Sequence, residues 1–511
     1  MKFPLTHSLK TRLCALLLAA GVTACAPAFA ATTITVSPEK AIATNGGVFE
    51  GWGTSLCWWA NRLGYSDTLA QLAANSLFGP DGLHLNIMRY NIGGGDDPAH
   101  DHITRTDSEV PGWLYPDDSG KGYRYDYTAD HNQINVMQRA VAAAGEDAMV
   151  EVFSNSPPYF MTQSGCSSGA LKAKDNNLRD DAVEDFAEYL AHVTAYIRGE
   201  LGMPVVSLSP MNEPNTDYWA AYSPKQEGCH VDKGRSQSAI LEATADAIAR
   251  YGLDGVLLAA SDETNPKLQA EAIKGYSAKA KQAVGRINTH TYSDKGARSL
   301  AKLAASEGLN LWMSETDGSG TAGKHAGEMS AALWLGQKII SDISALSPSA
   351  WVMWQAIDSH ISAEGYNGNT DTGMVDVNGG FWGVAVADHD KNEIVLTQKY
   401  YGFGQFTRYI RPGSTLIPCN KDALAAYDAD AQTLTIVLVN ADNKEKAVEL
   451  NLSAFAKVGE SAQAYRTSGS MANGEHWAAL DPLPTQDGRM NFPLKAHSIT
   501  TLVIPGTVQF R

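Results

Sequence analysis

Short apolar runs alternate with longer amphipathic stretches between about residue 50 and residue 356. Each apolar run has the length of a strand, and its near-continuous apolar character is typical of strands buried on both faces. In the stretches between them, apolar residues recur at steps of three and four, as in 181–202, where Gly202 ends the predicted helix. The eight apolar runs are 49–56, 85–90, 148–153, 205–210, 255–260, 286–290, 309–314 and 350–355.

Eight strand–helix alternations without a predicted hairpin indicate a parallel sheet, and their number favours a closed (β/α)8 barrel. An open doubly wound sheet is the alternative, but no glycine-rich phosphate motif follows the first run. From about residue 396, short alternating or β-branched runs separated by Asn, Asp and Gly turns predict an antiparallel β-sandwich. We therefore predict an α/β protein with a (β/α)8 TIM barrel at 48–395 and an accessory β-sandwich at 396–511. A strand within 31–47 is expected to join the sandwich.

The first 30 residues have the pattern of an export signal. Three basic residues precede an apolar segment at 13–22, and the small-residue sequence Ala28-Phe29-Ala30 follows it. This predicts a secreted or periplasmic protein. The competing interpretation is a lipoprotein box that would leave Cys25 lipidated at the cell envelope. No later segment reaches the ~18 apolar residues of a membrane span.

The formal net charge of -16 narrows the range of partners. So acidic a chain repels phosphate backbones and anionic membrane surfaces, which argues against a nucleic-acid partner. A neutral substrate agrees better with this charge.

The cysteines leave two possibilities open. Cys166 and Cys229 lie in predicted loops, and export would permit a disulfide between them. The alternative is two unpaired thiols. Because no zinc-ligand spacing and no H-E-x-x-H motif occur, we expect no metal site.

Two glutamates lie where a barrel places its chemistry, just after the strands. Glu213 follows the fourth run and Glu315 follows the seventh. Glycosidic cleavage requires two such carboxyl groups, one to protonate the leaving oxygen and one to attack the anomeric carbon. Donors and flat aromatic rings near other strand ends are candidates for substrate binding. They are Arg89, Asn155, Tyr159, Asn212, Trp219, His290, Tyr292 and Trp354.

Each candidate also has a purely structural interpretation. A glutamate after a strand is often a solvated loop acid, Trp354 could plug the barrel end, and His290 could be a core histidine. Arg89 could pair a buried carboxylate, and we interpret Asp262 as a helix cap. The functional interpretation is favoured because both glutamates fall at strand ends on opposite sides of one predicted barrel.

At these positions the sequence resembles glycoside hydrolase family 30, and most closely its endo-β-1,6-galactanase branch. The resemblance extends over nearly the whole chain after the export signal. The segments that carry it are Gly51-Trp52-Gly53-Thr54-Ser55-Leu56 with Trp58-Trp59-Ala60, Asn86-Ile87-Met88-Arg89-Tyr90-Asn91, Phe153-Ser154-Asn155-Ser156-Pro157, Asn212-Glu213-Pro214, Gln226-Glu227-Gly228-Cys229-His230, Ala259-Ala260-Ser261-Asp262-Glu263, Trp351-Val352-Met353-Trp354-Gln355-Ala356 and Gln405-Phe406-Thr407-Arg408.

The resemblance implies a retaining hydrolase without a cofactor, in which Glu213 is the acid/base and Glu315 the nucleophile. It implies cleavage of β-1,6-galactan side chains of the arabinogalactan type. Two departures concern the pocket wall: Thr316 follows the nucleophile where the galactanase branch carries an aromatic residue, and Tyr159 stands where tryptophan is usual. Alternative substrates in the family are β-1,6-glucan, glucosylceramide-like, β-fucosyl or β-galactosyl compounds and xylan. A carbohydrate-binding surface protein without activity is the alternative outside enzymes.

Overall fold

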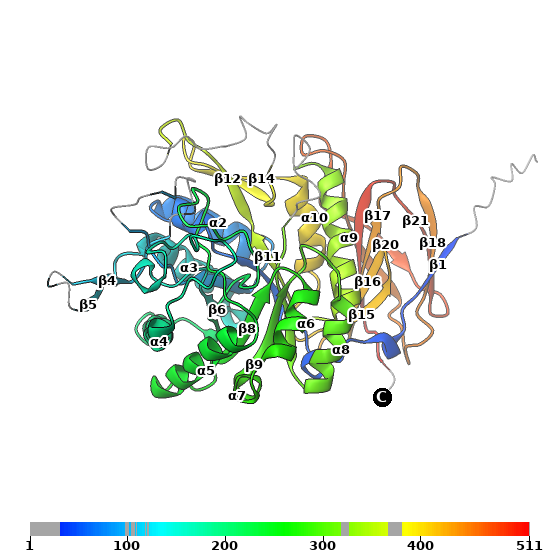
Figure 1. The fold of residues 1–511 in the computed structure, drawn as a ribbon. Helices are drawn as coiled ribbons and strands as arrows, with labels where there is room; N and C mark the ends of the chain where they lie inside the picture. Colours follow the sequence, from blue (N-terminus) through cyan, green and yellow to red (C-terminus); the bar gives the residue numbers. More distant parts are fainter. Residues whose placement is uncertain are drawn as a thin grey trace, which may run out of the picture.

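Eight parallel strands close into a barrel at the centre of the molecule (Figure 1). The computed structural model describes residues 31–97, 102–103, 108, 110–117, 119, 122–317, 327–365 and 381–509. Each of the eight predicted apolar runs forms one barrel strand, which confirms the predicted barrel. The strands are β2 (Gly51–Ser55), β3 (Ile87–Asn91), β6 (Met149–Phe153), β7 (Val205–Ser209), β8 (Leu257–Glu263), β9 (Val284–His290), β10 (Asn310–Glu315) and β11 (Ala350–Gln355).

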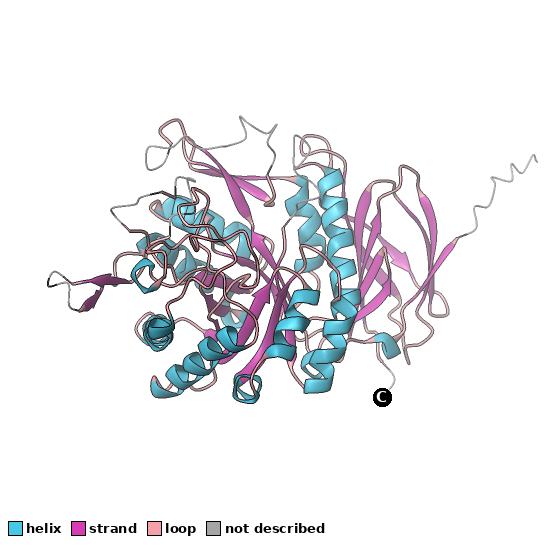
Figure 2. Cartoon of the chain, viewed as in Figure 1, coloured by secondary structure: helices cyan, strands magenta, loops and turns pink. Residues whose placement is uncertain are grey.

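Helices surround this barrel (Figure 2). In α4, the apolar residues at steps of three and four form the buried stripe, with Phe186, Leu190 and Ile197 at most 2% exposed. The acidic face of the same helix remains in solvent, as expected for an amphipathic helix on a barrel. The helices are α1 (Trp59–Leu63), α2 (Asp67–Phe78), α3 (His131–Ala144), α4 (Val183–Gly199), α5 (Arg235–Arg250), α6 (Pro266–Gly275), α7 (Ala278–Ala283), α8 (Ala297–Glu307), α9 (Met329–Leu346) and α10 (Gln398–Thr407).

The C-terminal region forms two facing sheets with their own apolar core, which confirms the predicted sandwich. The larger sheet has the order β15 (Thr415–Asn420), β16 (Ala423–Asp428), β17 (Thr433–Asn440), β22 (Ser498–Pro505), β19 (Ser461–Ser468) and β20 (Glu475–Pro484). The smaller sheet has the order β1 (Thr32–Thr35), β18 (Lys446–Asn451) and β21 (Arg489–Leu494). Strand β1 precedes the barrel in the sequence but pairs with β18 of the sandwich. Its buried Ile34, and Val36 just after it, therefore belong to the sandwich core.

Helices α9 and α10 lie between barrel and sandwich (Figure 1). A Cβ atom at Gly336 of α9 would lie 3.2 Å from both Ile499 of β22 and Val439 of β17, so the helix packs closely on the larger sheet. On the barrel side, Phe403 of α10 packs edge-on against the ring of Trp52 in β2. These contacts join the two units into one body and fix the sandwich beside the barrel.

Two small sheets were not predicted. The hairpin of β4 (Leu114–Pro116) and β5 (Tyr123–Tyr125) projects from the molecule after β3. A second sheet, of β12 (Ile357–Ile361), β13 (Ala385–Asp388) and β14 (Glu393–Leu396), lies between β11 and α10 in the sequence. The predicted export signal and Cys25 lie outside the described residues. Among the helices that are described, none has the length and apolar character needed to cross a membrane.

Candidate active site

Glu213 lies in the loop directly after β7, at the end of the barrel where strands terminate. Its backbone is left-handed, with φ at 46°, and its amide donates a 2.8 Å hydrogen bond to the carbonyl of Asp262. A non-glycine residue rarely adopts this conformation unless its surroundings enforce it, and such residues cluster at functional sites. The Tyr218 hydroxyl donates to Oε2 of Glu213, while the Nδ1 atom of His290 lies 3.1 Å from Oε1.

Glu315 is the last residue of β10, and its carboxylate is held from several sides. Nη1 of Arg89 donates a 2.9 Å hydrogen bond to Oε2, and the Tyr292 hydroxyl donates to Oε1 at 2.9 Å. The Nδ1 atom of His290 lies 3.3 Å from the same Oε1 atom. With 3% of the residue exposed, these donors fix one orientation of the carboxylate.

The two carboxylates face each other across His290. Oxygen atoms of Glu213 and Glu315 and a ring nitrogen of His290 all lie within 4.8 Å of one another. Retaining glycosidases place their carboxyl groups about 5–5.5 Å apart, whereas inverting ones leave about 6.5–9.5 Å for a water molecule. The short separation in this protein matches the first arrangement.

A buried network of opposite charges lies below this pair. Arg89 is fully buried, and besides Glu315 it contacts Glu151 (Nε to Oε1, 3.0 Å) and Asp262 (Nη2 to Oδ1, 3.4 Å). Arg286 forms a second ion pair with Glu151. Each buried charge therefore has a charged partner, which offsets much of the free-energy cost of removing it from water.

This network sets the protonation of the groups above it. Burial by itself lowers the pKa of His290, but the charge of Glu315 and the contacts with Asp262 and Glu213 outweigh it and raise the pKa to about 10. The imidazole is therefore protonated at neutral pH. Burial raises the pKa of Glu315, and the positive charges of His290 and Arg89 act in the opposite direction. Those two cations therefore favour the ionised form of the carboxylate.

Glu213, His290 and Glu315 are also the described residues whose arrangement could hold a metal ion. The observed contacts, with His290 between two carboxylates, are those of an ion-paired histidine.

A cavity of about 800 Å³ opens above the two glutamates. Its walls are aromatic, and Trp58 and Trp354 meet edge-to-face there with ring centroids 5.1 Å apart. The Trp219 ring lies so close to Gly228 that a Cβ atom at Gly228 would be 2.1 Å from it, which explains why glycine occupies that position. The lining residues are Trp58, Asn212, Glu213, Tyr218, Trp219, Pro224, Lys225, Gln226, Thr264, Tyr292, Glu315, Asp317, Trp354 and Trp382.

The residues predicted from sequence reach this site to different degrees. Arg89 and His290 contact the carboxylates from below and do not line the cavity. Asn155 lies beside Asn212 around a separate void of about 10 Å³. Tyr159 lies outside the cavity lining, where its ring packs edge-to-face against Phe160 at 5.2 Å.

Of the two possibilities for Cys166 and Cys229, a disulfide or unpaired thiols, the structure has the second, since both are free thiols. The Cys166 sulfur instead lies 3.2 Å from Nε2 of His102 and accepts a hydrogen bond from the amide of Tyr222. Cys229 packs in the main apolar core. The two loops therefore come together without bringing their sulfur atoms into contact.

The interpretation of Asp262 as a helix cap is wrong. Asn265 caps α6, and its side chain accepts a hydrogen bond from the amide of Leu268. Asp262 lies inside β8, where it accepts hydrogen bonds of 2.5 Å from both Ser209 and Ser314 and pairs with Arg89. A carboxylate just before a helix gives the same sequence signal in either role.

Three aromatic residues of the site were missed. Trp58 belongs to a motif already noted, and Tyr218 precedes the predicted Trp219, so position in the chain could have suggested both. Trp382 comes from the segment before β13, and its backbone amide donates to Asp358 of β12 at 2.5 Å. No periodic signal marks Trp382, because a loop rather than a strand brings it to the cavity.

A family model described as "O-Glycosyl hydrolase family 30" matches residues 32–264, the region that includes Glu213. This match supports the resemblance to glycoside hydrolase family 30 that the sequence motifs indicate. A family 30 glycosidase also agrees with the two glutamates at strand ends.

Two curated proteins are similar to this chain over most of its length. The chain is 29% identical over 500 residues to an endo-beta-1,6-galactanase of Hypocrea rufa, covering 93% of this chain and 95% of that enzyme. It is 26% identical over 547 residues to an exo-beta-1,6-galactobiohydrolase of Bifidobacterium longum subsp. longum. That match covers 84% of this chain and 36% of the longer enzyme.

Solved structures share the fold at lower identity. A conserved exported protein from Bacteroides fragilis has a TM-score of 0.71 at 18% identity, covering 92% of this chain and all of that one. A family 30 subfamily 8 xylanase from Clostridium acetobutylicum has a TM-score of 0.64 at 18% identity, covering 93% and 99%.

Proposed function

We propose that this protein is a retaining endo-β-1,6-galactanase that cleaves β-1,6-linked galactan side chains. The observation that carries the retaining mechanism is the separation of the two carboxylates, whose oxygen atoms lie within 4.8 Å of each other around His290. The substrate assignment is supported by the relative from Hypocrea rufa, which matches over 95% of its length and is named as an endo-acting enzyme.

In the first step, a carboxylate oxygen of Glu315 bonds to the anomeric carbon while the bond from that carbon to the glycosidic oxygen breaks. Glu213 donates its proton to the departing oxygen. The result is a glycosyl-enzyme ester and an ionised Glu213. Arg89 and Tyr292 hold Glu315 by one hydrogen bond to each oxygen, so the nucleophile keeps its orientation before substrate arrives.

In the second step, Glu213 accepts a proton from water while the water oxygen bonds to the anomeric carbon and displaces Glu315. Two displacements on opposite faces return the original configuration. His290 donates toward either carboxylate, so its positive charge stabilises whichever glutamate is ionised.

The sugar ring is expected to lie between the tryptophan walls of the cavity, with its C–H faces against the rings. The side-chain oxygen of Asn212 has no hydrogen-bond partner among the described residues and lies next to the acid/base. We assign it to the 2-hydroxyl group, a contact that tightens as the ring approaches an oxocarbenium ion.

The test is product analysis on β-1,6-galactan stripped of arabinose, with β-1,6-glucan and glucuronoxylan as parallel substrates. Galactose oligomers of several lengths released from galactan alone, with the β anomer appearing first by proton NMR, would support the proposal. Single galactose units would replace the endo assignment by an exo one, and activity on another polymer would overturn the substrate. An α anomer appearing first would overturn the retaining mechanism.

A further inference from the structure

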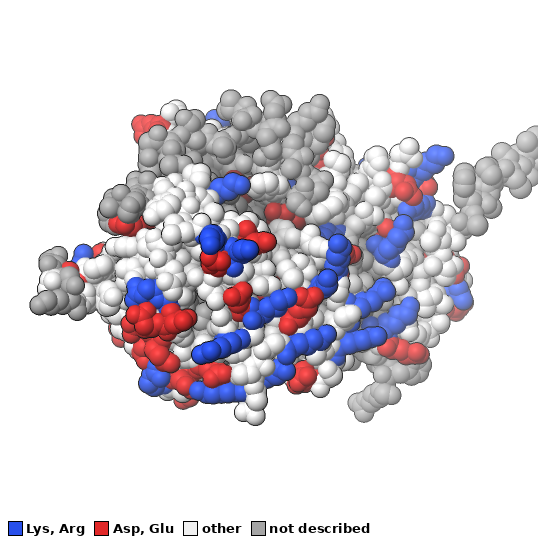
Figure 3. Space-filling view, in the orientation of Figure 1, with Lys and Arg blue, Asp and Glu red and all other residues white. Residues whose placement is uncertain are grey.

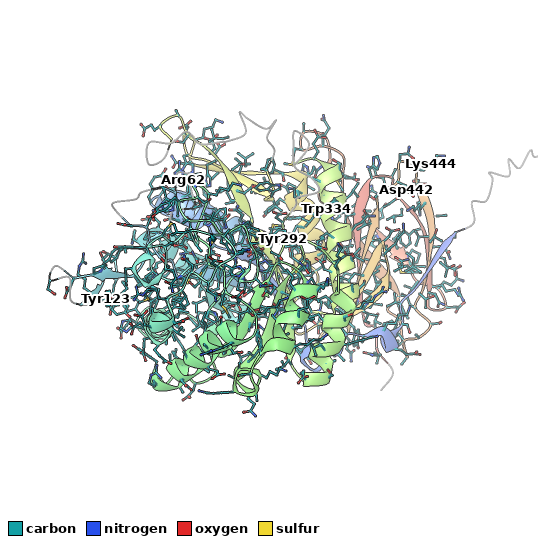
Figure 4. All side chains as sticks on the ribbon, in the orientation of Figure 1. Arg62, Tyr123, Tyr292, Trp334, Asp442 and Lys444 are labelled. Carbon is teal, nitrogen blue, oxygen red and sulfur yellow. The ribbon has the colours of Figure 1, made fainter. Side chains whose placement is uncertain are left out.

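An exposed aromatic ring, Tyr123, lies on the hairpin of β4 and β5, away from the catalytic cavity. Tyr123 is 53% exposed, and one face of its ring stacks on Phe160 with centroids 4.8 Å apart and planes 19° apart. Figure 4 shows Tyr123 on the projecting hairpin, well separated from Tyr292 at the active site. We call Tyr123, Phe160 and Tyr159 the hairpin platform.

The platform is held in place by the protein core. Tyr125, which lies on the same face of β5 as Tyr123, stacks on His192 of α4 with centroids 3.9 Å apart. Next to the hairpin, Trp113 is fully buried, and its amide and indole nitrogens both donate hydrogen bonds. The exposed ring of Tyr123 therefore has a defined position.

Two of the platform residues come from the end of the barrel that carries the active site. Tyr159 and Phe160 lie in a short 3-10 turn that follows β6, the strand whose end supplies Asn155 beside Asn212. Tyr159 packs edge-to-face on Phe160, and Phe160 stacks on Tyr123. These contacts form a row of rings that runs from the strand end to the hairpin.

The chemistry of the row indicates its ligand. Its members are flat rings, two of which have hydroxyl groups, and none is aliphatic. Such rings offer apolar faces to the C–H faces of sugars while their hydroxyl groups remain in water. Tyr123 is the exposed ring and lies on the projecting hairpin, while Phe160 and Tyr159 extend the row as partly buried rings.

We propose that the hairpin platform is a second, non-catalytic binding site for neutral polysaccharide, which binds hexopyranose units of a chain remote from the bond being cut. This inference rests on the proposed function, because the bound chain is taken to be the polymer that the cavity cleaves. The platform would raise the affinity for polymer and leave the chemistry on short substrates unchanged.

The test uses Tyr123→Ala in the full chain, combined with Glu315→Gln so that the polymer stays intact. In native electrophoresis through gels containing β-1,6-galactan, we expect the dissociation constant to rise about three- to tenfold relative to Glu315→Gln alone. In the active enzyme, KM for polymer should rise similarly, while kcat/KM on a short aryl glycoside should stay unchanged.

Tyr123→Phe keeps the ring and should bind as the parent does. Tyr65→Ala is the matched control, since Tyr65 is 56% exposed and lies outside the platform. Phe160→Leu is the second variant, which keeps an apolar side chain under Tyr123 and removes the flat ring. Parent-like retardation in Tyr123→Ala and Phe160→Leu would overturn the platform.

Failure of the proposed function gives a different result. If the enzyme cleaves glucan or xylan instead, the same gels containing that polymer test the platform on it. Loss of retardation in Tyr123→Ala would then support the platform and reject only the galactan assignment. If none of the three polymers retards the Glu315→Gln protein, the platform is overturned.

Discussion

Arg89 shows how one residue can serve stability and chemistry together. Its guanidinium is fully buried and contacts Glu151, Asp262 and Glu315 while packing over the ring of Phe153. The sequence left open whether Arg89 pairs with a buried carboxylate or with a sugar. The contacts favour the carboxylates, one of which is the proposed nucleophile.

Glu315→Gln should lower turnover by about three orders of magnitude or more, because an amide cannot form the glycosyl-enzyme ester. The substitution keeps the shape of the side chain, so the far-UV circular dichroism spectrum should match that of the wild type. Steady-state kinetics on the natural polymer measure the loss. Glu307→Gln, at an exposed glutamate of α8, is the matched control. Near wild-type turnover in Glu315→Gln would reject the nucleophile assignment.

Glu213→Ala should lose activity according to the leaving group. We expect a loss of about 10²- to 10⁴-fold on polysaccharide, whose leaving oxygen needs a proton. An aryl glycoside with an acidic phenol needs little protonation and should suffer much less in the glycosylation step. Pre-steady-state kinetics on both substrates test this, with Glu200→Ala as the exposed control. Equal losses on the two substrates would contradict the acid/base role.

At the level of elements, irregular pairing between barrel strands determines where the side chains of the site point. The register between β9 and β10 shifts between Met313 and Glu315, so that Glu315 pairs with His290. The register between β8 and β9 shifts between Ser261 and Glu263, around Asp262. Such bulges re-aim side chains at the ends of barrel strands. The predicted strands were confirmed, but sequence patterns do not reveal a register shift.

Substitutions in β1 test how much this strand contributes to the stability of the sandwich. Ile34→Ala should destabilise the protein by about 2–4 kcal/mol, because Ile34 is 5% exposed within the sandwich core. Thr33→Ala, on the exposed face of the same strand, should change stability by less than about 0.5 kcal/mol. Chemical unfolding followed by fluorescence measures both. Equal effects would show that β1 contributes little through its buried face.

At the level of the whole molecule, charged groups on the surface and in the interior contribute differently to stability. In the view of Figure 3, acidic and basic side chains both cover the helical face of the barrel. One exposed ion pair joins Lys279 of α7 to Asp246 of α5. Exposed pairs of this kind contribute little to stability. The interior holds several titratable groups whose pKa values are displaced, so the pH dependence of stability should come mainly from them.

Stability should fall as pH rises from about 5 to 9. Burial raises the pKa of Asp130 to about 7, of Glu227 to about 8 and of Glu263 to about 7. The folded state therefore retains protons that the unfolded chain releases near pH 4 to 5. His290, with its pKa raised to about 10, adds stability that is complete below its unfolded pKa near 6.5 and is lost as pH rises through 10.

At acid pH, ion-paired carboxylates have the opposite effect, since they make stability fall as pH falls. Hydrogen bonds from Arg466 lower the pKa of Glu475 to about 2, so its contribution is present above its unfolded pKa and is lost as pH falls toward 2. Thermal unfolding from pH 3 to 9 should thus give a maximum midpoint near pH 5. Glu227→Gln, which mimics the neutral carboxyl, should flatten the slope between pH 5 and 8. An unchanged slope in that variant would contradict the role of Glu227.

The sequence by itself determined the barrel, the sandwich and the positions of the two glutamates. Strands buried on both faces must be apolar throughout, and helices on a barrel must be apolar on one stripe, so both patterns are visible in one dimension. Glu213 and Glu315 could be located because strand ends define one face of the barrel.

Only the tertiary structure decided the details of the site. Tyr218 and Trp382 reach the cavity, Tyr159 turns to the hairpin, and the Cys166 sulfur contacts His102 rather than Cys229. These outcomes depend on the paths of loops, which have no periodic pattern and are fixed by contacts between residues far apart in the chain. The charge state of His290 likewise depends on carboxylates from three different segments, which meet only when the barrel closes.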